Sequence, residues 1–400
     1  MLDVKKQKMY NGFKIKTFKI KGRERKMVEV FCFPVAEGDF LWVRYGEEKK
    51  SHILIDGGTK EFGYLYKNVL MSIDEKDERI EAIILTHIDN DHIQGAIDGI
   101  ANTPEDVLNK IVKRIYFNTC SAIQRELKLE KTVCAEKEIL ASIWKNGYGV
   151  GEGIEFLKIL KNKKILDRLL DFVIEGQQYD LDDGARMKII SPGEKELKQL
   201  AEKWETYHQR KELIVYSAGG ETHYQRDLKE LMNEKLGNDT SVNNKSSIAF
   251  VLTYQNSKML FLGDSNPKVC VEGAKHAGIK NPCPVDLIKL SHHGSKANMS
   301  DELLSFFPTQ YYLVSTDGSR KKVPNKTVLA HLLTVSDSEK PVWLLANYEW
   351  WADMYHEKYF TEGDKENYLK TERLKVKFLD SKGIEVNGDT KIYGQYDGMG

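Results

Sequence analysis

Short apolar runs recur along the chain, separated by turns and by longer charged segments. Several of them alternate apolar and polar residues, or are apolar throughout, over about four to eight positions, which is typical of strands. We expect strands at residues 27–34, 39–45, 52–55, 80–86, 187–190, 247–254, 259–262, 285–290 and 311–315. A helical pattern covers residues 62–72. Strands separated by helices and ended by glycine turns favour an α/β fold with a layered core.

Two long charged stretches interrupt this pattern of strands. Residues 121–175 and 195–235 carry apolar side chains at helical spacing, so we expect helical insertions there, the second mostly solvated. Residues 1–340 would then form one α/β domain that carries both insertions. Residues 341–400 would form an aromatic-rich extension packed on the same domain.

An aromatic cluster lies at the start of the expected extension. Its members are Trp343, Trp350, Trp351, Tyr355 and Tyr359. Large aromatic side chains are common in cores and are also enriched at protein interfaces. We therefore interpret the cluster as core, with a docking surface for a partner protein as the alternative.

Charge and cysteine usage exclude several classes of protein. The 60 lysines and arginines balance 60 aspartates and glutamates, which excludes a protein that wraps nucleic acid through excess basic charge. The five cysteines are odd in number and form no CxxC pair, so neither a disulfide framework nor a thiolate zinc site is expected. The chain has no signal-peptide core and no run of about 18 apolar residues, which predicts a cytoplasmic protein without a membrane span.

Four potential metal ligands follow one of the buried strands within six residues. They are His87, Asp89, Asp91 and His92. A turn after the strand would bring them together, and imidazole nitrogen mixed with carboxylate oxygen suits borderline or hard divalent metals. The alternative is a polar turn in which an aspartate caps the next helix.

Two later segments place similar side chains after apolar strands. Asp264 follows a strand and a glycine, and the adjacent His292 and His293 follow another strand. Strands of an α/β sheet deliver such side chains to one edge, and buried neutral imidazoles need polar partners or a metal. The pattern therefore indicates one composite site built from distant segments.

The ordered motifs resemble those of the metallo-β-lactamase superfamily of hydrolases. They are Asp56-Gly57-Gly58, HxDxDH at residues 87–92, Gly263-Asp264 and His292-His293-Gly294-Ser295, with Glu37-Gly38-Asp39, Ser191-Pro192 and Asn243-Asn244 in the expected order. More narrowly, the HxDxDH motif is similar to the branch that contains the hydrolase domain of the competence protein ComEC. The resemblance implies an αβ/βα four-layer sandwich, with two mixed sheets face to face, helices outside and metals at one edge.

The resemblance also implies roles for individual residues. His87 and Asp89 would hold one metal, Asp91 and His92 the second, and Asp264 would bridge both. At least one of His292 and His293 would complete the site. Asp56 would orient a ligand by hydrogen bonding.

The sequence departs from the superfamily pattern at two positions. The usual third-motif histidine is missing after the strand near residue 117, where Asn118 follows, and Lys322-Val323-Pro324 stands where relatives carry a His-Pro pair. His331, on a predicted helix, is either a substitute ligand or an ordinary surface histidine.

Two divalent ions, zinc or manganese, would lower the pKa of a bound water and stabilise charge on the attacked group. The resulting hydroxide would be the nucleophile, with Asp91, Asp89 and His293 as the catalytic residues. Ser295 and Lys296 would bind substrate. Other basic residues near the site would contact phosphates or form a solvated rim: Lys289, Arg320, Lys321 and Lys322.

We therefore expect a phosphodiesterase or nuclease with DNA or RNA as substrate. The first alternative is a hydrolase of a small molecule such as a cyclic nucleotide, an ester or a lactam. The second is a partner-dependent subunit of a multi-protein system, for example in bacterial defence, that docks through its helical insertions.

Overall fold

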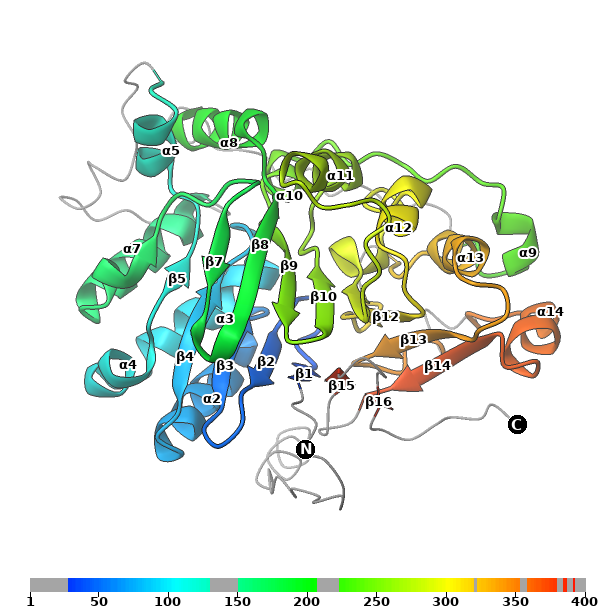
Figure 1. The fold of residues 1–400 in the computed structure, drawn as a ribbon, viewed down its shortest axis with the longest axis horizontal. Helices are drawn as coiled ribbons and strands as arrows, with labels where there is room; N and C mark the ends of the chain where they lie inside the picture. Colours follow the sequence, from blue (N-terminus) through cyan, green and yellow to red (C-terminus); the bar gives the residue numbers. More distant parts are fainter. Residues whose placement is uncertain are drawn as a thin grey trace.

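Two mixed β-sheets pack face to face, and helices cover the outer face of each (Figure 1). The computed structural model describes residues 28–129, 150–206, 223–319, 322–352, 358–379, 384–386 and 391–392. Within them each sheet has eight strands, in the orders β16-β15-β1-β2-β3-β4-β5-β6 and β14-β13-β12-β11-β10-β9-β8-β7.

Each sheet is built from consecutive strands of the chain, and the first sheet also contains β15 and β16. The first sheet contains β1 (Val28–Cys32), β2 (Leu41–Tyr45), β3 (Ser51–Ile55), β4 (Arg79–Ile84), β5 (Ile115–Tyr116), β6 (Leu169–Leu170), β15 (Ile384–Val386) and β16 (Lys391–Ile392). The second contains β7 (Gln178–Asp180), β8 (Ala185–Ser191), β9 (Ala249–Tyr254), β10 (Ser257–Phe261), β11 (Leu287–Lys289), β12 (Tyr311–Val314), β13 (Val342–Ala346) and β14 (Leu374–Phe378).

Helices lie on both outer faces. Those packed on the first sheet are α2 (Gly63–Glu75), α3 (Asn90–Ala101), α4 (Glu105–Ile111), α5 (Cys120–Glu126), α7 (Val150–Asn162) and α8 (Glu194–Thr206). Those packed on the second are α9 (Leu228–Leu231), α11 (Pro267–His276), α12 (Asp301–Phe306) and α13 (Lys326–Val335). Two short helices, α10 (Val242–Lys245) and α14 (Glu362–Asp364), complete the described set. None of the described helices is long and apolar enough to cross a membrane.

Both sheets change from antiparallel to parallel pairing along their length. In the first sheet β1, β2 and β3 are antiparallel, whereas β3, β4 and β5 are parallel. In the second sheet β8, β9 and β10 are antiparallel, whereas β10 to β14 are parallel. Because parallel strands end at a common edge, the segments after β4, β10 and β11 can meet there.

The core is divided into three layers of buried side chains. The middle layer lies between the sheets and includes Val43 and Phe250, while the outer two lie between each sheet and its helices. All five residues of β2 and all five of β3 are buried. Most side chains on both faces of these two strands are therefore apolar. The predicted αβ/βα four-layer fold is confirmed.

The two expected insertions differ from the prediction. Helices α5, α7 and α8 bury apolar side chains such as Phe156 and Trp204 in the outer layer of the first sheet, so only the outer face of α8 is solvated. Leu169–Leu170, expected to be helical, pairs with β5 as the edge strand β6. The high charge of these segments reflects only their outer faces. Residues 130–149 and 207–222 lie outside the described residues.

The expected boundary at residue 340 is also corrected. Beyond it, β13 and β14 extend the second sheet beside β12, and β15 pairs with β1 in the first sheet (Figure 1). The segment is therefore part of both sheets rather than an extension packed on a finished domain. Its polar residues, such as Lys375 and Lys377 in β14, hide the strand pattern in the sequence.

The aromatic cluster belongs to the core where it is described. Trp350, Trp351 and Tyr359 are buried against the helices of the second sheet, and Trp343 stacks on Tyr311. Tyr355 lies outside the described residues. Of the described members, only Trp343 is partly exposed.

A buried polar chain links β2 and β3 to the loop before β4. Trp42 Nε1 donates to His52 Nδ1 at 3.0 Å, and His52 Nε2 lies 3.0 Å from Glu78 Oε2. Indole is only a donor, so His52 Nδ1 must keep its lone pair and the ring must be neutral. Burial accordingly lowers the pKa of His52, and the Glu78 carboxylate offsets only part of this effect.

The neutral His52 predicts a pH-dependent loss of stability. Because the unfolded state binds this proton more readily, the contribution of His52 is complete above its unfolded pKa and falls as the pH drops below about 6.5. We expect the free energy of unfolding to fall more steeply between pH 7.5 and 5.5 in the native protein than in a His52→Asn variant. Urea unfolding at several pH values measures this difference, and equal slopes would disprove the neutral ring.

Candidate metal centre

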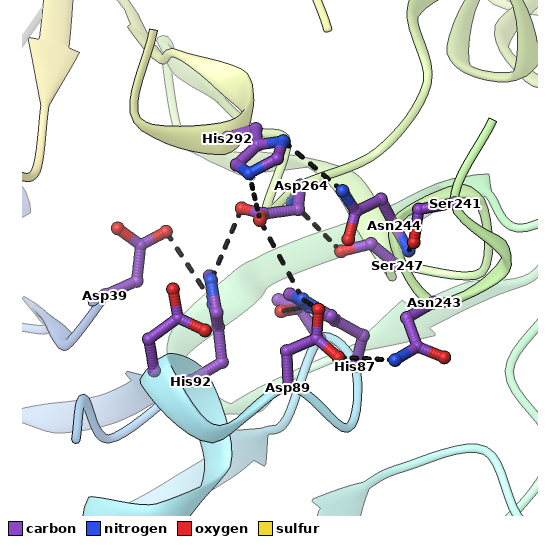
Figure 2. Close-up of polar contacts among 12 residues, drawn as sticks. Asp39, His87, Asp89, His92, Ser241, Asn243, Asn244, Ser247, Asp264 and His292 are labelled. Carbon is purple, nitrogen blue, oxygen red and sulfur yellow. Dashed lines mark hydrogen bonds and ion pairs between the residues drawn. The ribbon is translucent and has the colours of Figure 1, made fainter. Parts of the chain in front are cut away.

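The loop between β4 and α3 brings its histidines and aspartates to the edge where the strands end. His87 and His92 are buried, and Asp89 precedes the first turn of α3. Asp264 follows β10, and a short turn, Ser291–Gly294, follows β11. Figure 2 shows these segments converging, with Asp264 between His292 on one side and His87 and His92 on the other.

Asp56, at the end of β3, fixes the orientation of His92. Its Oδ1 accepts from the Thr86 backbone N–H at 2.8 Å, and its Oδ2 lies 2.7 Å from Thr86 Oγ1 and 2.8 Å from His92 Nδ1. The carboxylate thus holds the proton on Nδ1 and leaves the lone pair of Nε2 facing the site. The next residue, Gly57, must be glycine because a Cβ there would lie 2.2 Å from the Ala96 nitrogen.

The two oxygens of Asp264 face different pairs of histidines. Oδ1 lies 3.3 Å from His92 Nε2 and 4.0 Å from His293 Nε2. Oδ2 lies 3.8 Å from His87 Nε2 and 3.6 Å from His292 Nε2. A carboxylate with imidazole nitrogens gathered around each oxygen is suited to bridge two cations.

Asp89 and Asp91 lie at the more open side of the centre. Asp89 Oδ2 is 3.6 Å from His87 Nε2, and Asp91 Oδ2 is 3.7 Å from His293 Nε2. Their side chains are 34% and 21% exposed, whereas that of Asp264 is 3% exposed. Asn243 donates a hydrogen bond to Asp89 Oδ1 (Figure 2). The exposed carboxylates are therefore the ones that an entering molecule would meet first.

His292 and His293 occupy a strained turn that aims both rings inward. Both residues have positive φ, 48° and 56°, a conformation that ordinary residues adopt at an energetic cost. His292 Nδ1 lies 2.9 Å from Asn298 Oδ1, and His293 Nδ1 lies 2.7 Å from the Ser315 carbonyl. Each Nδ1 is thereby occupied as a donor, so each Nε2 is left as an acceptor.

The centre contains buried polar atoms that make no hydrogen bond. These atoms are Nε2 of His87, His92 and His293 and Oδ1 of Asp264. The centre contains two groups of potential ligand atoms, and within each group the atoms lie within 4.8 Å of one another. One group comes from His87, His92 and Asp264, and the other from Asp91, His92 and His293. Buried polar atoms without partners are costly, and divalent cations would satisfy them. The residues present therefore fit a pair of metal ions.

The charges of the centre favour cations. Burial alone would raise the pKa of Asp264, but His292, His92 and His293 hold it well below its usual value. Burial would lower the pKa of His293, but Asp39 and Asp264 raise it to about 9, and Asp264 and Asp56 similarly raise that of His92. The carboxylates thus attract positive charge strongly enough to draw protons onto imidazoles, and a divalent ion would be attracted to the same place.

Two buried charges of opposite sign, Lys289 and Asp39, lie beside the centre. Lys289 ion-pairs with Asp39, and Asp39 Oδ1 lies 3.4 Å from His293 Nδ1. Burial would raise the pKa of Asp39, but Lys289 and His293 hold it below its usual value. Lys289, expected either to contact phosphate or to form part of a solvated rim, does neither and is a buried partner of Asp39. The only signals for this pair were Glu37-Gly38-Asp39 and a lysine inside an apolar strand.

Asp239 is a further residue that no motif indicated. It accepts hydrogen bonds from the Asn244 and Asn298 side chains, at 2.5 and 2.8 Å, and its Oδ2 lies 3.5 Å from His292 Nδ1. Asp239 follows a charged stretch without an apolar strand before it, so no sequence pattern indicates its place beside His292. It supports His292 from the side opposite Asp264.

The two departures from the superfamily motifs have structural roles in the described residues. Asn118 exchanges two hydrogen bonds with the backbone of Val173, away from the centre. Pro324 packs behind the histidine turn, where a Cβ on Gly294 would lie 2.7 Å from Pro324 Cβ. Both residues therefore support neighbouring segments.

The remaining basic and histidine predictions have different outcomes. His331 is buried, with Nδ1 2.6 Å from Asp301 Oδ1 and Nε2 2.8 Å from the Glu234 carbonyl, so it is neither a substitute ligand nor a surface residue. Ser295 and Lys296 directly follow the histidine turn and are half-buried. Arg320 and Lys321 lie outside the described residues.

Comparison with known protein families finds a match to part of the chain. Residues 41–125 match the model described as Metallo-beta-lactamase superfamily, and no curated protein matches the chain. Among solved structures, the metallo-beta-lactamase fold protein YhfI from Bacillus subtilis is 12% identical, with 91% of this chain and 99% of that chain covered and a TM-score of 0.35.

Two longer proteins show similar scores. CmlA, a diiron beta-hydroxylase from Streptomyces venezuelae, is 11% identical, with 79% of this chain and 48% of that chain covered and a TM-score of 0.35. A long form RNase Z from yeast is 10% identical, with 81% and 36% covered and a TM-score of 0.35. The chain therefore spans less than half the length of each of these two proteins.

Proposed function

We propose that the chain is a hydrolase of the metallo-beta-lactamase superfamily, and within it a phosphodiesterase with two divalent metal ions in its centre. Members of this superfamily are generally hydrolases that bind two divalent metals. The observation that carries the proposal is the position of Asp264, whose two oxygens face His92 and His293 on one side and His87 and His292 on the other.

The proposed metal ligands divide into two sets. We assign His87 and Asp89 to the side of Asp264 Oδ2, because His87 Nε2 lies 3.8 Å from that oxygen and 3.6 Å from Asp89 Oδ2. We assign Asp91, His92 and His293 to the side of Oδ1, because His92 Nε2 lies 3.3 Å from Oδ1 and atoms of these three residues lie within 4.8 Å of one another. His292 faces Oδ2 and is proposed to complete the first set. When bound, the cations would supply an activated water and stabilise negative charge on the attacked group and the leaving oxygen.

The more exposed carboxylates have the proposed roles in the chemical step. Asp89 and Asp91 are positioned to orient the attacking water and to accept its proton, because they combine access to solvent with contacts to His87 and His293. Asn243 holds one oxygen of Asp89 and leaves the other directed toward His87. Asp56 acts through His92 by fixing its ring.

Manganese and zinc are the proposed ions. Zinc commonly takes imidazole and carboxylate ligands, whereas the three aspartates among the ligands favour a harder ion such as manganese. We propose nucleic acid as the substrate because the HxDxDH motif resembles the branch associated with DNA uptake. Ser295 and Lys296, directly after the histidine turn, are proposed to contact the substrate.

Hydrolysis assays with defined metals test this function. Protein stripped with a chelator and reloaded with Mn²⁺ or Zn²⁺ is expected to cleave single-stranded DNA or RNA and to lose this activity when chelator is added again. A Ser295→Ala, Lys296→Ala variant should raise KM for the nucleic acid more than it lowers kcat. Cleavage of only a cyclic nucleotide, an ester or a lactam would contradict the nucleic-acid substrate, and inactivity toward every phosphodiester would contradict the phosphodiesterase.

A further inference from the structure

Lys289 and Asp39 form an ion pair that is closed off from solvent beside the centre. The side chain of each is 1% exposed. Lys289 is the last residue of β11, and Asp39 lies just before β2, so the pair joins the two sheets. Two charges buried without water are stable only as a pair, because each alone would carry a large desolvation cost.

The pair touches the metal centre through its carboxylate. Asp39 Oδ1 lies 3.4 Å from His293 Nδ1, and Asp39 Oδ2 lies 4.0 Å from His92 Nδ1 (Figure 2). Both rings present their opposite nitrogen, Nε2, to Asp264. The charge of the pair is therefore separated from the proposed ions by a single imidazole ring.

Asp39 also belongs to a third group of potential ligands. Atoms of Asp39, Asp56 and His92 lie within 4.8 Å of one another, and all three residues are buried, whereas Asp91 in the second group is only half-buried. This group differs from the others because a cation of the chain, the Lys289 ammonium, already contacts its Asp39 oxygen. The third group is thus supplied with positive charge by the protein itself.

We propose that Lys289 is a resident cation of the metal centre: it neutralises Asp39 and thereby sets the affinity of the centre for divalent ions. Without it, Asp39 would add one more uncompensated carboxylate to Asp56, Asp89, Asp91, Asp239 and Asp264. Each uncompensated charge strengthens the attraction for cations and repels an anionic substrate. This inference rests on the proposed function only through the presence of metal ions, and substrate plays no part in its test.

The two single variants are expected to change metal affinity in opposite directions. Lys289→Gln removes a positive charge, so chelator-stripped protein should bind Mn²⁺ about tenfold more tightly in a calorimetric titration with MnCl2. Asp39→Asn leaves the lysine uncompensated, so the same titration should show binding about tenfold weaker. The double variant Asp39→Asn, Lys289→Gln keeps two groups that can hydrogen-bond and has no net change of charge, so its affinity should stay within about threefold of the native value.

Opposite directions separate this role from a purely structural one. If the pair only held the sheets together, both single variants would weaken binding, and that result would overturn the inference, as would two unchanged affinities. Circular dichroism identifies a variant that does not fold. The remaining single variant is then compared with the double variant, where recovery of the native affinity supports the inference and absence of recovery contradicts it. A native protein that binds no Mn²⁺ would instead contradict the proposed function.

Discussion

Replacing Asp264 with asparagine is expected to abolish metal-dependent hydrolysis. The carboxylate is buried and each of its oxygens faces two imidazole nitrogens, so the amide nitrogen of the variant would point a donor at one of the proposed cation positions. Loss of several kcal/mol of transition-state stabilisation corresponds to a fall of about 1,000-fold or more in kcat/KM. Steady-state kinetics on Mn²⁺-loaded protein measure this fall.

A second readout separates loss of metal from loss of fold. Ligands that bind only the native state stabilise it, so Mn²⁺ should raise the melting temperature of the native protein but not that of the Asp264→Asn variant. Asp180→Asn is the matched control because Asp180 is exposed and pairs with Arg186 on the surface. The control should keep both activity and the Mn²⁺ effect. An Asp264→Asn variant with full activity and two bound ions would show that Asp264 is not the bridge.

Replacing Lys326 with methionine is expected to cause the largest loss of stability. Its ammonium is fully buried, contacts Asp364 and donates to the carbonyls of Tyr224 and Arg226 at 3.1 and 2.6 Å. Asp364 in turn accepts from the Leu228 backbone N–H at 2.6 Å. The variant leaves a buried carboxylate and two carbonyls without their cation, a loss of about 3–5 kcal/mol. Urea unfolding measures the change.

The surface pair of Lys275 and Glu302 provides the comparison for this variant. Both side chains are more than half exposed, so Lys275→Met should lower the free energy of unfolding by no more than about 1 kcal/mol. Lys326→Met should leave Mn²⁺ binding by the remaining folded protein unchanged, because the pair lies outside the proposed ligands. An unfolding midpoint equal to that of Lys275→Met would show that the buried pair contributes nothing.

The fold was predictable for most strands that burial makes apolar, although the apolar β13 was interpreted only as part of the aromatic cluster. Strands such as β3 and β9 carry continuous apolar runs, and their flanking turns are marked by glycine or polar residues. Strands at the sheet edges were not predictable, because β6 has two residues and β14 alternates lysines with apolar side chains. Charged helices were misjudged for a similar reason, since α8 hides Trp204 on its inner face behind a polar outer face.

The candidate site was predictable where ligands cluster in the sequence. His87 to His92 form one compact motif, and Asp264 and His292 each follow an apolar strand, so position and residue type together indicated a site. Asp239 lacks such a context and is brought to His292 by tertiary packing alone. Lys289 lies beside the centre, as expected, but it contacts Asp39 instead of phosphate or solvent. A sequence does not show whether the last side chain of a strand points toward solvent or toward a buried partner.

Anomalous X-ray scattering from crystals of the Mn²⁺-loaded protein tests the central claim most directly. Two peaks are predicted beside Asp264, one next to Oδ2 with His87 and the other next to Oδ1 with His92 and His293. Peaks at both positions would support a dinuclear centre built by these residues. The absence of any peak at Asp264, or a single ion bound elsewhere, would contradict it.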